Sequence, residues 1–326
     1  MRHLVGVTAT STAPTAIAIT GGDAAYFELM RDCVGSLRAL PEGRAMALGV
    51  LDCGLTDEQR AWCRVQGARL VAAQWEFDFP GRDKLKEGYK ALVARPFLPR
   101  YFPGFDQYLW IDSDCWVQQG DALALFLAAA RSGALAVAPE IHRSMRHFYH
   151  AWKEFSSVNG AAYERAFGRD IAEKLIRYPL INAGVFALRA DAPHWAVWAK
   201  LLGEALQRST DMTEQISLNV LVYEKGLACE PLPSRCNWPV HHATPVWNAE
   251  RSLFVEPAMP YEALGILHLT LDTKWRATLA VRELGGAFDG QVRERSVRWP
   301  GGALGPPDGM PAAPAGALRA PGRTAI

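Results

Sequence analysis

The sequence predicts an α/β fold in which helices cover both faces of one mostly parallel sheet. Short apolar runs alternate with helix-like segments from residue 16 to residue 138, and this alternation is typical of repeated strand–helix units. One run, residues 108–111, is apolar at every position, as expected for a central strand covered on both faces. With 326 residues, 49% of them hydrophobic, the chain can bury a sizeable core.

Each element is predicted from its own local signals. Strands are expected at the short apolar runs 16–20, 45–51, 68–73, 108–111 and 134–138. The first helix ends before Pro41 and has apolar residues at intervals of three or four, namely Phe27, Met30, Val34 and Leu37. Thr56 is the predicted N-cap of the second helix, and further helices are expected over residues 83–94 and 121–131. Ligands of such folds bind beyond the carboxyl ends of the strands.

Composition and charge exclude several classes of protein. Lys and Arg number 35 against 34 Asp and Glu, so the near-zero net charge argues against a general nucleic-acid binder. No apolar run is long enough to span a membrane and no signal-peptide pattern is seen, so a cytoplasmic protein is expected. The six cysteines include no CxxC pair, which argues against a zinc ribbon or a disulfide framework.

The C-terminal end differs in composition from the rest of the chain. Residues 299–326 are mainly Pro, Gly and Ala, which cannot bury enough apolar area to offset the entropy lost on ordering. We therefore expect a disordered tail over 299–326 and a single domain over 1–298.

The strongest local feature follows the central apolar run. Asp112 and Asp114 stand one residue apart where this strand is expected to end. Carboxylates at the carboxyl edge of a parallel sheet offer oxygen ligands for Mg²⁺ or Mn²⁺, which bind one or two carboxylates together with substrate phosphates. The alternative is a pair of solvated loop aspartates, and the tripeptide alone does not decide between the two.

Residues 108–114, which read YLWIDSD, resemble the signature of glycosyltransferase family 8. Five further motifs of this family occur in the family's order, and the resemblance covers residues 16–276. It implies the GT-A fold, retaining transfer of a hexose from a UDP-sugar, and Mn²⁺ (or Mg²⁺) as the cofactor.

Two motifs ahead of the carboxylates concern the nucleotide. An Asp-x-x-Tyr turn follows the first predicted strand, and the resemblance implies that Tyr26 stacks on the uracil while Asp23 lies near the base. Ala25 stands where the family often has Asn, and the alternative for Tyr26 is a core aromatic. Arg95 stands where the family carries a basic residue, and the resemblance implies that it contacts the diphosphate or the donor sugar. Lys90 is a second candidate, for which a solvated helix cation is the favoured interpretation.

Two later motifs concern the sugar. Residues 181–186 (INAGVF) imply that Asn182 holds the sugar near its anomeric carbon, the alternative being a bulge or turn. Residues 213–219 (TEQISLN) imply that Glu214, in place of the family's Asp, grips the sugar hydroxyls and that Gln215 lies by the anomeric carbon. The other interpretation, a helix start capped by Thr213 or Asp211, is compatible with the first.

The last motif, residues 268–275 (HLTLDTKW), implies that His268 completes the metal site and that Lys274 contacts the diphosphate. An imidazole ligand suits Mn²⁺ better than Mg²⁺. Leu271 stands where the family has Gly, and the Pro that precedes the family's Trp is absent. The alternative for His268 is a partly buried structural histidine.

Weaker signals remain outside these motifs. His142, His147 and His150 lie in a basic, aromatic stretch within residues 139–177, where the family builds its acceptor region. His147 and His150 are expected on a helix, as part of a solvated face or an acceptor-binding flap. Residues 232–238 (LPSRCNW), followed by two histidines, resemble another family segment, and Cys115 is expected to be a packed residue.

The sequence thus predicts a metal-dependent retaining glycosyltransferase with a UDP-glucose or UDP-galactose donor. The acceptor is a glycan, a lipid-linked glycan or a small polyol. The alternatives are a catalytically degenerate protein of the same fold that only binds nucleotide or sugar and a sugar-phosphate nucleotidyltransferase. The latter lacks support because its Gly-rich loop is missing after the first strand.

Overall fold

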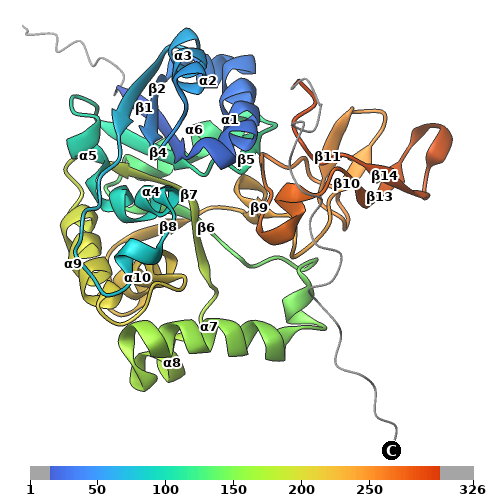
Figure 1. Ribbon diagram of the computed structural model, residues 1–326. Coiled ribbons are helices and arrows are strands. Elements are labelled where there is room, and N and C mark those ends of the chain that lie inside the picture. The colour runs from blue at the N-terminus through green and yellow to red at the C-terminus, as the bar shows by residue number, and fades with distance from the viewer. Residues whose placement is uncertain (1–14, 302–326) are drawn as a thin grey trace, which may run out of the picture.

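A seven-stranded sheet lies at the centre of the computed structural model, which describes residues 15–301 (Figure 1). Its strand order is β3-β2-β1-β4-β7-β6-β8. Only β7 runs against the other six strands, which confirms the prediction of a mostly parallel sheet. The strands are β1 (Ala16–Gly22), β2 (Ala47–Asp52), β3 (Ala68–Ala72), β4 (Gln107–Ile111), β6 (Leu135–Pro139), β7 (Ile181–Arg189) and β8 (Cys229–Pro231).

Helices cover both faces of this sheet, as predicted, because successive strand side chains point to opposite faces. In β4, Leu109 and Ile111 pack into a core with α1 (Phe27–Ala39) and α6 (Gly120–Ala130). Tyr108 and Trp110 point to the other face, where they join α9 (His194–Leu206) and α10 (Thr213–Tyr223). The fully apolar run of β4 therefore reflects burial on both sides.

Local sequence signals explain several of the helix boundaries. Thr56 caps α3 (Asp57–Val65) as predicted: its side chain accepts a hydrogen bond from the Gln59 N–H, and the Gln59 side chain accepts one from the Thr56 N–H. Pro41 ends α1 and opens the short α2 (Pro41–Ala45).

The helix predicted over residues 83–94 is wrong over most of its length. The chain there forms 3₁₀ turns at Arg82–Lys84 and Glu87–Tyr89, and only α4 (Lys90–Ala94) is α-helical. Gly81, with φ of 81°, precedes the first turn, and residue 88 is a second glycine, so the segment lacks the uninterrupted helix formers that propagation requires. Pro96 was expected to follow the end of this helix, but it lies within a 3₁₀ turn, Arg95–Phe97, which continues into α5 (Leu98–Tyr101).

Two small sheets were not predicted. One has the order β5-β12-β9, from β5 (Cys115–Val117), β12 (Ile266–His268) and β9 (Trp238–Pro239). The other consists of β11 (Leu253–Val255), β10 (Val246–Asn248), β13 (Leu279–Leu284) and β14 (Val292–Arg295), and its β13–β14 hairpin projects from the body at the right of Figure 1. Their strands are too short for their periodicity to stand out in the sequence.

The ends of the chain lie largely outside the described residues. Of the predicted tail, residues 302–326 are not described, and the domain boundary at 298 stays a prediction. Trp299 packs against the core of the small sheets, with its ring over Gly35 of α1.

Between β6 and β7 the chain forms α7 (Trp152–Phe167) and α8 (Arg169–Leu175), which lie along the lower edge of the molecule in Figure 1. The prediction that His147 and His150 share a helix is wrong. His147 lies in a 3₁₀ turn, Arg146–Phe148, and α7 begins only at Trp152.

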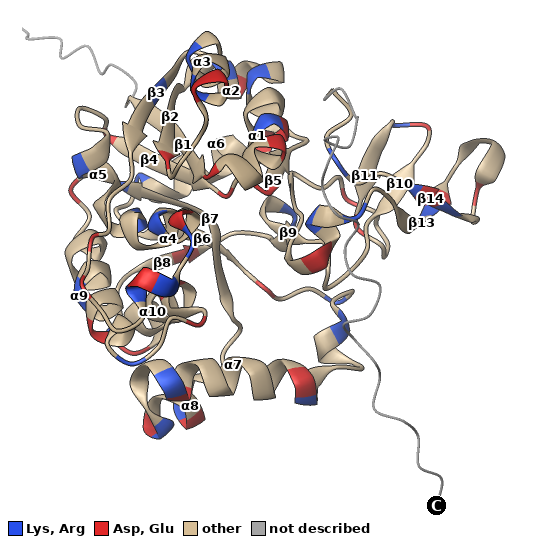
Figure 2. Ribbon diagram, viewed as in Figure 1, with Lys and Arg blue, Asp and Glu red and all other residues tan. Residues whose placement is uncertain are grey.

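Charges of both signs are interspersed over the helices (Figure 2), as the balanced composition implies. Among residues 15–301, no helix combines the length and the apolarity that crossing a membrane requires.

Candidate active site

The two carboxylates follow β4 at the carboxyl edge of the sheet. Because β7 is antiparallel to β4, it begins at the edge where β4 ends, and Ile111 pairs with Val185. The Asp112 N–H donates to the Gly184 carbonyl over 2.7 Å. Strand direction thus brings Asp112 beside Asn182 and Gly184, which lie some 70 residues later.

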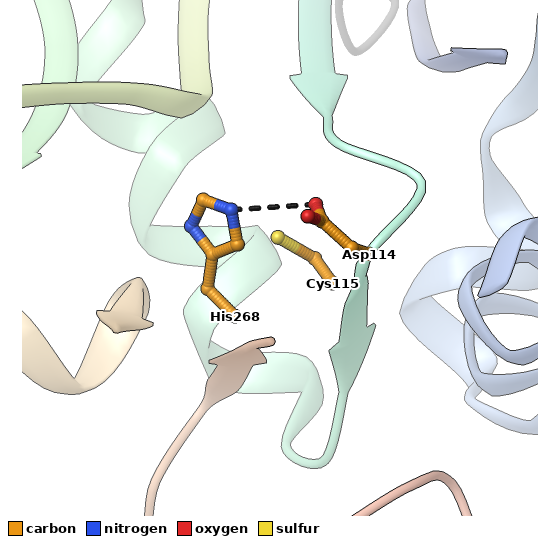
Figure 3. Close-up of side chains that lie close together, drawn as sticks. All are labelled: Asp114, Cys115 and His268. Atoms are coloured by element: carbon orange, nitrogen blue, oxygen red, sulfur yellow. Dashed lines mark ion pairs between the residues drawn. The ribbon is translucent and has the colours of Figure 1, made fainter. Parts of the chain in front are cut away.

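The small sheet β5-β12-β9 brings His268 to the same place. His268 ends β12 and pairs with Cys115 of β5, the residue after Asp114. Its Nε2 lies 3.3 Å from Asp114 Oδ1 and 3.8 Å from Asp112 Oδ2. Figure 3 shows His268 facing Asp114 and Cys115 across the space between the two strands.

The carboxylates of Asp112 and Asp114 and the imidazole of His268 are suitably spaced to bind a divalent cation. Neighbouring ligands at about 2.1 Å from one ion lie about 3 Å apart, close to the separations of the His268 nitrogen from the two carboxylates. A glycine leaves the space: a Cβ on Gly184 would lie 2.3 Å from His268 Cε1 and 2.9 Å from Asp112 Oδ2. Two carboxylate oxygens with one imidazole form a donor set that a divalent metal ion can use.

Cys115 also lies at this site. The ligand atoms of Asp114, Cys115 and His268 all lie within 4.8 Å of one another, whereas Asp112 is not a member of that group. Burial, followed by the charges of Asp114 and Asp112, raises the pKa of the Cys115 thiol well above its usual value. The buried thiol therefore stays protonated, as expected of the packed residue that the sequence predicted.

Two cations, the buried Arg95 and the partly buried Lys274, hold the carboxylates. The Arg95 guanidinium, 3% exposed, donates to Asp112, to Glu214 Oε1 (2.9 Å) and to the Ala183 carbonyl (3.0 Å). Its face lies over the Trp110 ring. Lys274 Nζ donates to Asp114 Oδ2 over 2.5 Å. A basic residue was predicted at both positions, but the ion pairs with Asp112 and Glu214 were not.

The two aspartates differ in acidity because their surroundings differ. Burial favours the neutral form of both. In Asp114 the facing side chains of His268 and Lys274 outweigh burial and hold its pKa well below the usual value. In Asp112 burial prevails over the charge of Arg95, and the pKa is raised.

Glu214 and Gln215 open α10, and both line the site. Burial raises the pKa of Glu214 to about 7, although Arg95 opposes this. Gln215 Oε1 accepts a hydrogen bond from the Ala183 N–H over 3.3 Å. Neither Thr213 nor Asp211 caps the helix, because the N-cap position is Met212, which makes no side-chain cap.

Asn182 lies in β7 where the pairing with β6 is irregular: Val137 pairs with Phe186 but Pro139 pairs with Ile181, so the extra residues of β7 fall at 182–185. The bulge considered as the alternative for Asn182 is therefore present. The Asn182 Nδ2 donates to Glu140 Oε1 over 2.6 Å, and its Oδ1 accepts from the Gly184 N–H over 2.8 Å. The side chain is 4% exposed.

A second group of residues in the site was predicted only as separate segments, His147 within the expected acceptor region 139–177 and the two histidines that follow residues 232–238. His242 Nε2 donates to Glu140 Oε2 over 2.9 Å, and His147 stacks on Phe155. Burial lowers the pKa of His147 to about 4 and that of His241 to about 3. The paired histidines after residue 240 were the available signal, but only the fold brings them to His147.

Asp23, Tyr26 and Lys90 are not among the residues that line the site, although Tyr26 contacts Lys274, which is. The Asp23 carboxylate accepts hydrogen bonds from the Ala25 and Tyr26 N–H groups. Tyr26 contacts the edge of Trp275, with Lys274 Nζ 5.3 Å from its ring centre. Lys90 pairs with Glu87.

One cavity of about 570 Å³ joins the two groups of residues, which form its two walls. Its lining includes the predicted residues Arg95, Asp112, Asp114, Asn182, Glu214, Gln215, His268 and Lys274, but not Asp23 or Tyr26. The histidine wall contributes Glu140, His147, Phe155, His241 and His242. At the mouth, Leu271 is 66% exposed and has φ of 54°, a left-handed conformation that costs a leucine energy and a glycine almost none.

Solved structures share this architecture. The chain aligns with a galactosyltransferase, LgtC, in complex with donor and acceptor sugar analogs, with a TM-score of 0.50, 14% identity, and coverage of 77% of this chain and 86% of that one. The protein has the GT-A fold. Mouse xyloside xylosyltransferase 1 aligns over 80% of this chain and 99% of its own at 11% identity and a TM-score of 0.46. No protein-family model and no curated protein matches the sequence.

Proposed function

We propose that this GT-A protein is a metal-dependent retaining glycosyltransferase that moves a hexose from UDP-glucose or UDP-galactose to a hydroxyl of a glycan, a lipid-linked glycan or a polyol. One observation carries the proposal: two carboxylates and an imidazole converge in a cavity whose same wall holds a lysine and an arginine. This combination suits a substrate with a diphosphate. The hexose, its two donors and the retention come from the resemblance to glycosyltransferase family 8.

The carboxylate–imidazole group would hold the cofactor. Asp112, Asp114 and His268 would bind Mn²⁺ or Mg²⁺, whose charge stabilises a departing diphosphate. Lys274 can swing from Asp114 toward the diphosphate, since it is a flexible point charge at the cavity wall. Arg95 has two carboxylates and a carbonyl as partners, so its main action is to fix Asp112 and Glu214 in place.

The remaining wall residues would handle the sugar. Gln215 uses its Oε1 on the backbone, so its Nε2 is available to a sugar oxygen. Glu214 is held by Arg95 and Gln215 is a weak nucleophile, so a covalent sugar intermediate finds no suitable partner among these two. Retention then proceeds by attack of the acceptor on the face that the diphosphate leaves, with the phosphate taking up the proton.

The histidine wall suits an acceptor. His147 and His241 are neutral at pH 7, because burial lowers the pKa of both, and a neutral imidazole offers one donor and one acceptor, as a sugar hydroxyl does. Phe155 adds an aromatic surface on which the apolar face of a sugar ring can pack.

A specific observation favours a second candidate, a protein that binds the nucleotide sugar without transferring it. Leu271 occupies a left-handed loop position at the cavity mouth, so its side chain stands where a glycine would leave the backbone open to the ligand.

Hydrolysis and transfer assays separate the two candidates. The purified chain is incubated with UDP-glucose or UDP-galactose and Mn²⁺, and release of UDP is followed with and without excess EDTA. We expect Mn²⁺-dependent release, and proton NMR of the first sugar product should show the α-anomer. Release that persists in EDTA contradicts metal dependence, while ligand-induced thermal stabilisation without any turnover favours the binding-only candidate.

A further inference from the structure

We propose that Asn237 and Asn182 form, with Glu140, a directional hydrogen-bond chain that keeps the proton of His268 on Nδ1 and so reserves Nε2 for the cation. The inference rests on the proposed function for the presence of a metal ion. The hydrogen-bond geometry, in contrast, is observed among residues of this chain. The inference assigns Asn182 a positioning role, in place of the sugar contact that the sequence implied.

The chain is continuous from Glu140 to His268. Asn182 Nδ2 donates to Glu140 Oε1 over 2.6 Å, and Asn237 Nδ2 donates to Asn182 Oδ1 over 2.9 Å. His268 Nδ1 lies 3.0 Å from Asn237 Oδ1. Asn237 directly precedes β9, which pairs with β12, so sheet pairing places it beside the imidazole.

The two ends of the chain fix its direction. A carboxylate only accepts hydrogen bonds, and Glu140 also accepts from His242, so Asn182 must turn its Nδ2 toward Glu140. The Gly184 N–H only donates, and it lies 2.8 Å from the other side of the amide, which must therefore be Oδ1. Asn237 then has to present Nδ2 to Asn182, which leaves Oδ1 for His268.

Burial makes this direction costly to reverse. Glu140, Asn182, Asn237 and His268 are 5%, 4%, 2% and 4% exposed, so water has little access to a misdirected group. Turning either amide would place two acceptors or two donors face to face, and an unsatisfied buried polar group is expensive. The only hydrogen that can satisfy Asn237 Oδ1 at this end is the one on His268 Nδ1.

The consequence concerns the other imidazole nitrogen. Nε2 faces Asp114 and Asp112 at 3.3 and 3.8 Å, where the cation would lie. A histidine whose far N–H is held by a buried oxygen presents a fixed, more basic lone pair to a metal. Asn237 and Asn182 thereby act through His268 and need not touch the substrate.

The first test measures Mn²⁺ alone. Binding is followed by the EPR signal of free Mn²⁺ in wild-type protein and in Asn237→Ala, and we expect the variant to bind about 10–100-fold more weakly. Gln107→Ala is the matched control, because Gln107 is a buried amide with a hydrogen bond to Leu127 at the far end of β4. Equal affinity in wild type and Asn237→Ala overturns the inference.

A second pair of variants covers a failure of Asn237→Ala to fold. In Glu140→Gln the new Oε1 can still accept from Asn182, so the direction and the Mn²⁺ affinity should be kept. In Glu140→Leu the Asn182 Nδ2 loses its acceptor and only the Gly184 N–H still orients this amide, so the affinity should fall. If both substitutions weaken binding equally, direction is not what matters, and the inference is overturned.

The second readout is independent of the metal and of turnover. Nitrogen-15 NMR of labelled histidines, with His268→Gln to identify the signal, should show a proton on Nδ1 both without metal and with Mg²⁺. A His268 with unprotonated Nδ1 overturns the inference even if the enzyme is active. Failure of wild type to bind Mn²⁺ while Nδ1 stays protonated would instead count against the proposed function alone.

Discussion

The two walls of the cavity differ in the charge of their polar side chains. The carboxylate wall carries formal charges that are paired with one another, Arg95 with Asp112 and Glu214, and Lys274 with Asp114. The histidine wall holds His147 and His241 in the neutral state, because burial lowers the pKa of both, and Glu140 is hydrogen-bonded to His242. This difference indicates which wall binds ions. A metal cation could replace Lys274 or Arg95 as the partner of a carboxylate, and a diphosphate could replace a carboxylate as their partner, only on the carboxylate wall.

The largest effect is expected from Asp114→Asn, which removes a charge from the carboxylate wall. We expect Mn²⁺ binding to be lost and any transferase activity to fall about 10³-fold or more, because one of the donors is neutralised. The fold should persist, since the amide oxygen can still accept from Lys274. UDP release and far-UV circular dichroism are the measurements, and full activity in this variant would contradict the assignment of the wall.

Removal of Arg95 should cost the most stability. Arg95→Met leaves Asp112 and Glu214 without their buried partner, and breaking such a pair typically costs about 3–5 kcal/mol. Urea unfolding measures the change. Arg169→Met is the control, because Arg169 pairs with Glu173 at the surface, where both side chains are exposed, and it should cost about 1 kcal/mol or less. Equal losses in the two variants would mean that the network does not stabilise the wall.

The pH dependence of stability should have opposite signs on the two walls. Burial raises the pKa of Glu214 from 4.5 to about 7, so the folded state binds this proton more tightly than the unfolded chain. The resulting stability is complete below about pH 4.5 and is lost as pH rises toward 7, with a slope of at most about 1.4 kcal/mol per pH unit. Glu214→Gln should remove this slope in urea titrations of metal-free protein, and an unchanged slope would refute it.

His147 should contribute the reverse slope. Burial lowers its pKa from 6.5 to about 4, so its contribution is present above pH 6.5 and is lost as pH falls toward 4. His147→Phe retains an aromatic ring for stacking on Phe155 but cannot titrate. We expect the variant to lose less stability than wild type between pH 6.5 and 4, measured by the same titrations. His150→Phe, at an exposed position, is the control and should leave the slope unchanged.

Five strands of the central sheet could be predicted because their signals are local, whereas β7 and β8 were not predicted. The apolar run of β4 and the cap at Thr56 are each contained within a few residues, and both are confirmed. The small sheets escaped because their strands are two to six residues long and gain their stability from partners far along the chain, such as Cys115 with His268. Gly81 and Gly88 weakened the helix expected at 83–94 without leaving a clear breaker signal.

The same distinction holds for the site. Asp112 and Asp114 were found because they end a recognisable strand, and His268 and Lys274 because they match a motif. The ion pair of Arg95 with Glu214 spans 119 residues, and the bond between Asn237 and Asn182 spans 55. No spacing in the sequence encodes such contacts, so they emerge only when the sheets are assembled.

The smallest effect is expected at Leu271, which lines the cavity and is largely exposed. Its φ of 54° costs a residue with a Cβ about 1–2 kcal/mol, whereas glycine adopts it freely but loses more entropy on folding. Leu271→Gly should therefore raise the free energy of unfolding by about 0.5–1 kcal/mol, measured with urea. Leu271→Ala removes the same exposed side chain but keeps the Cβ, so it should give no gain. Equal effects of the two substitutions would show that side-chain contacts, and not backbone conformation, set the energy of this loop.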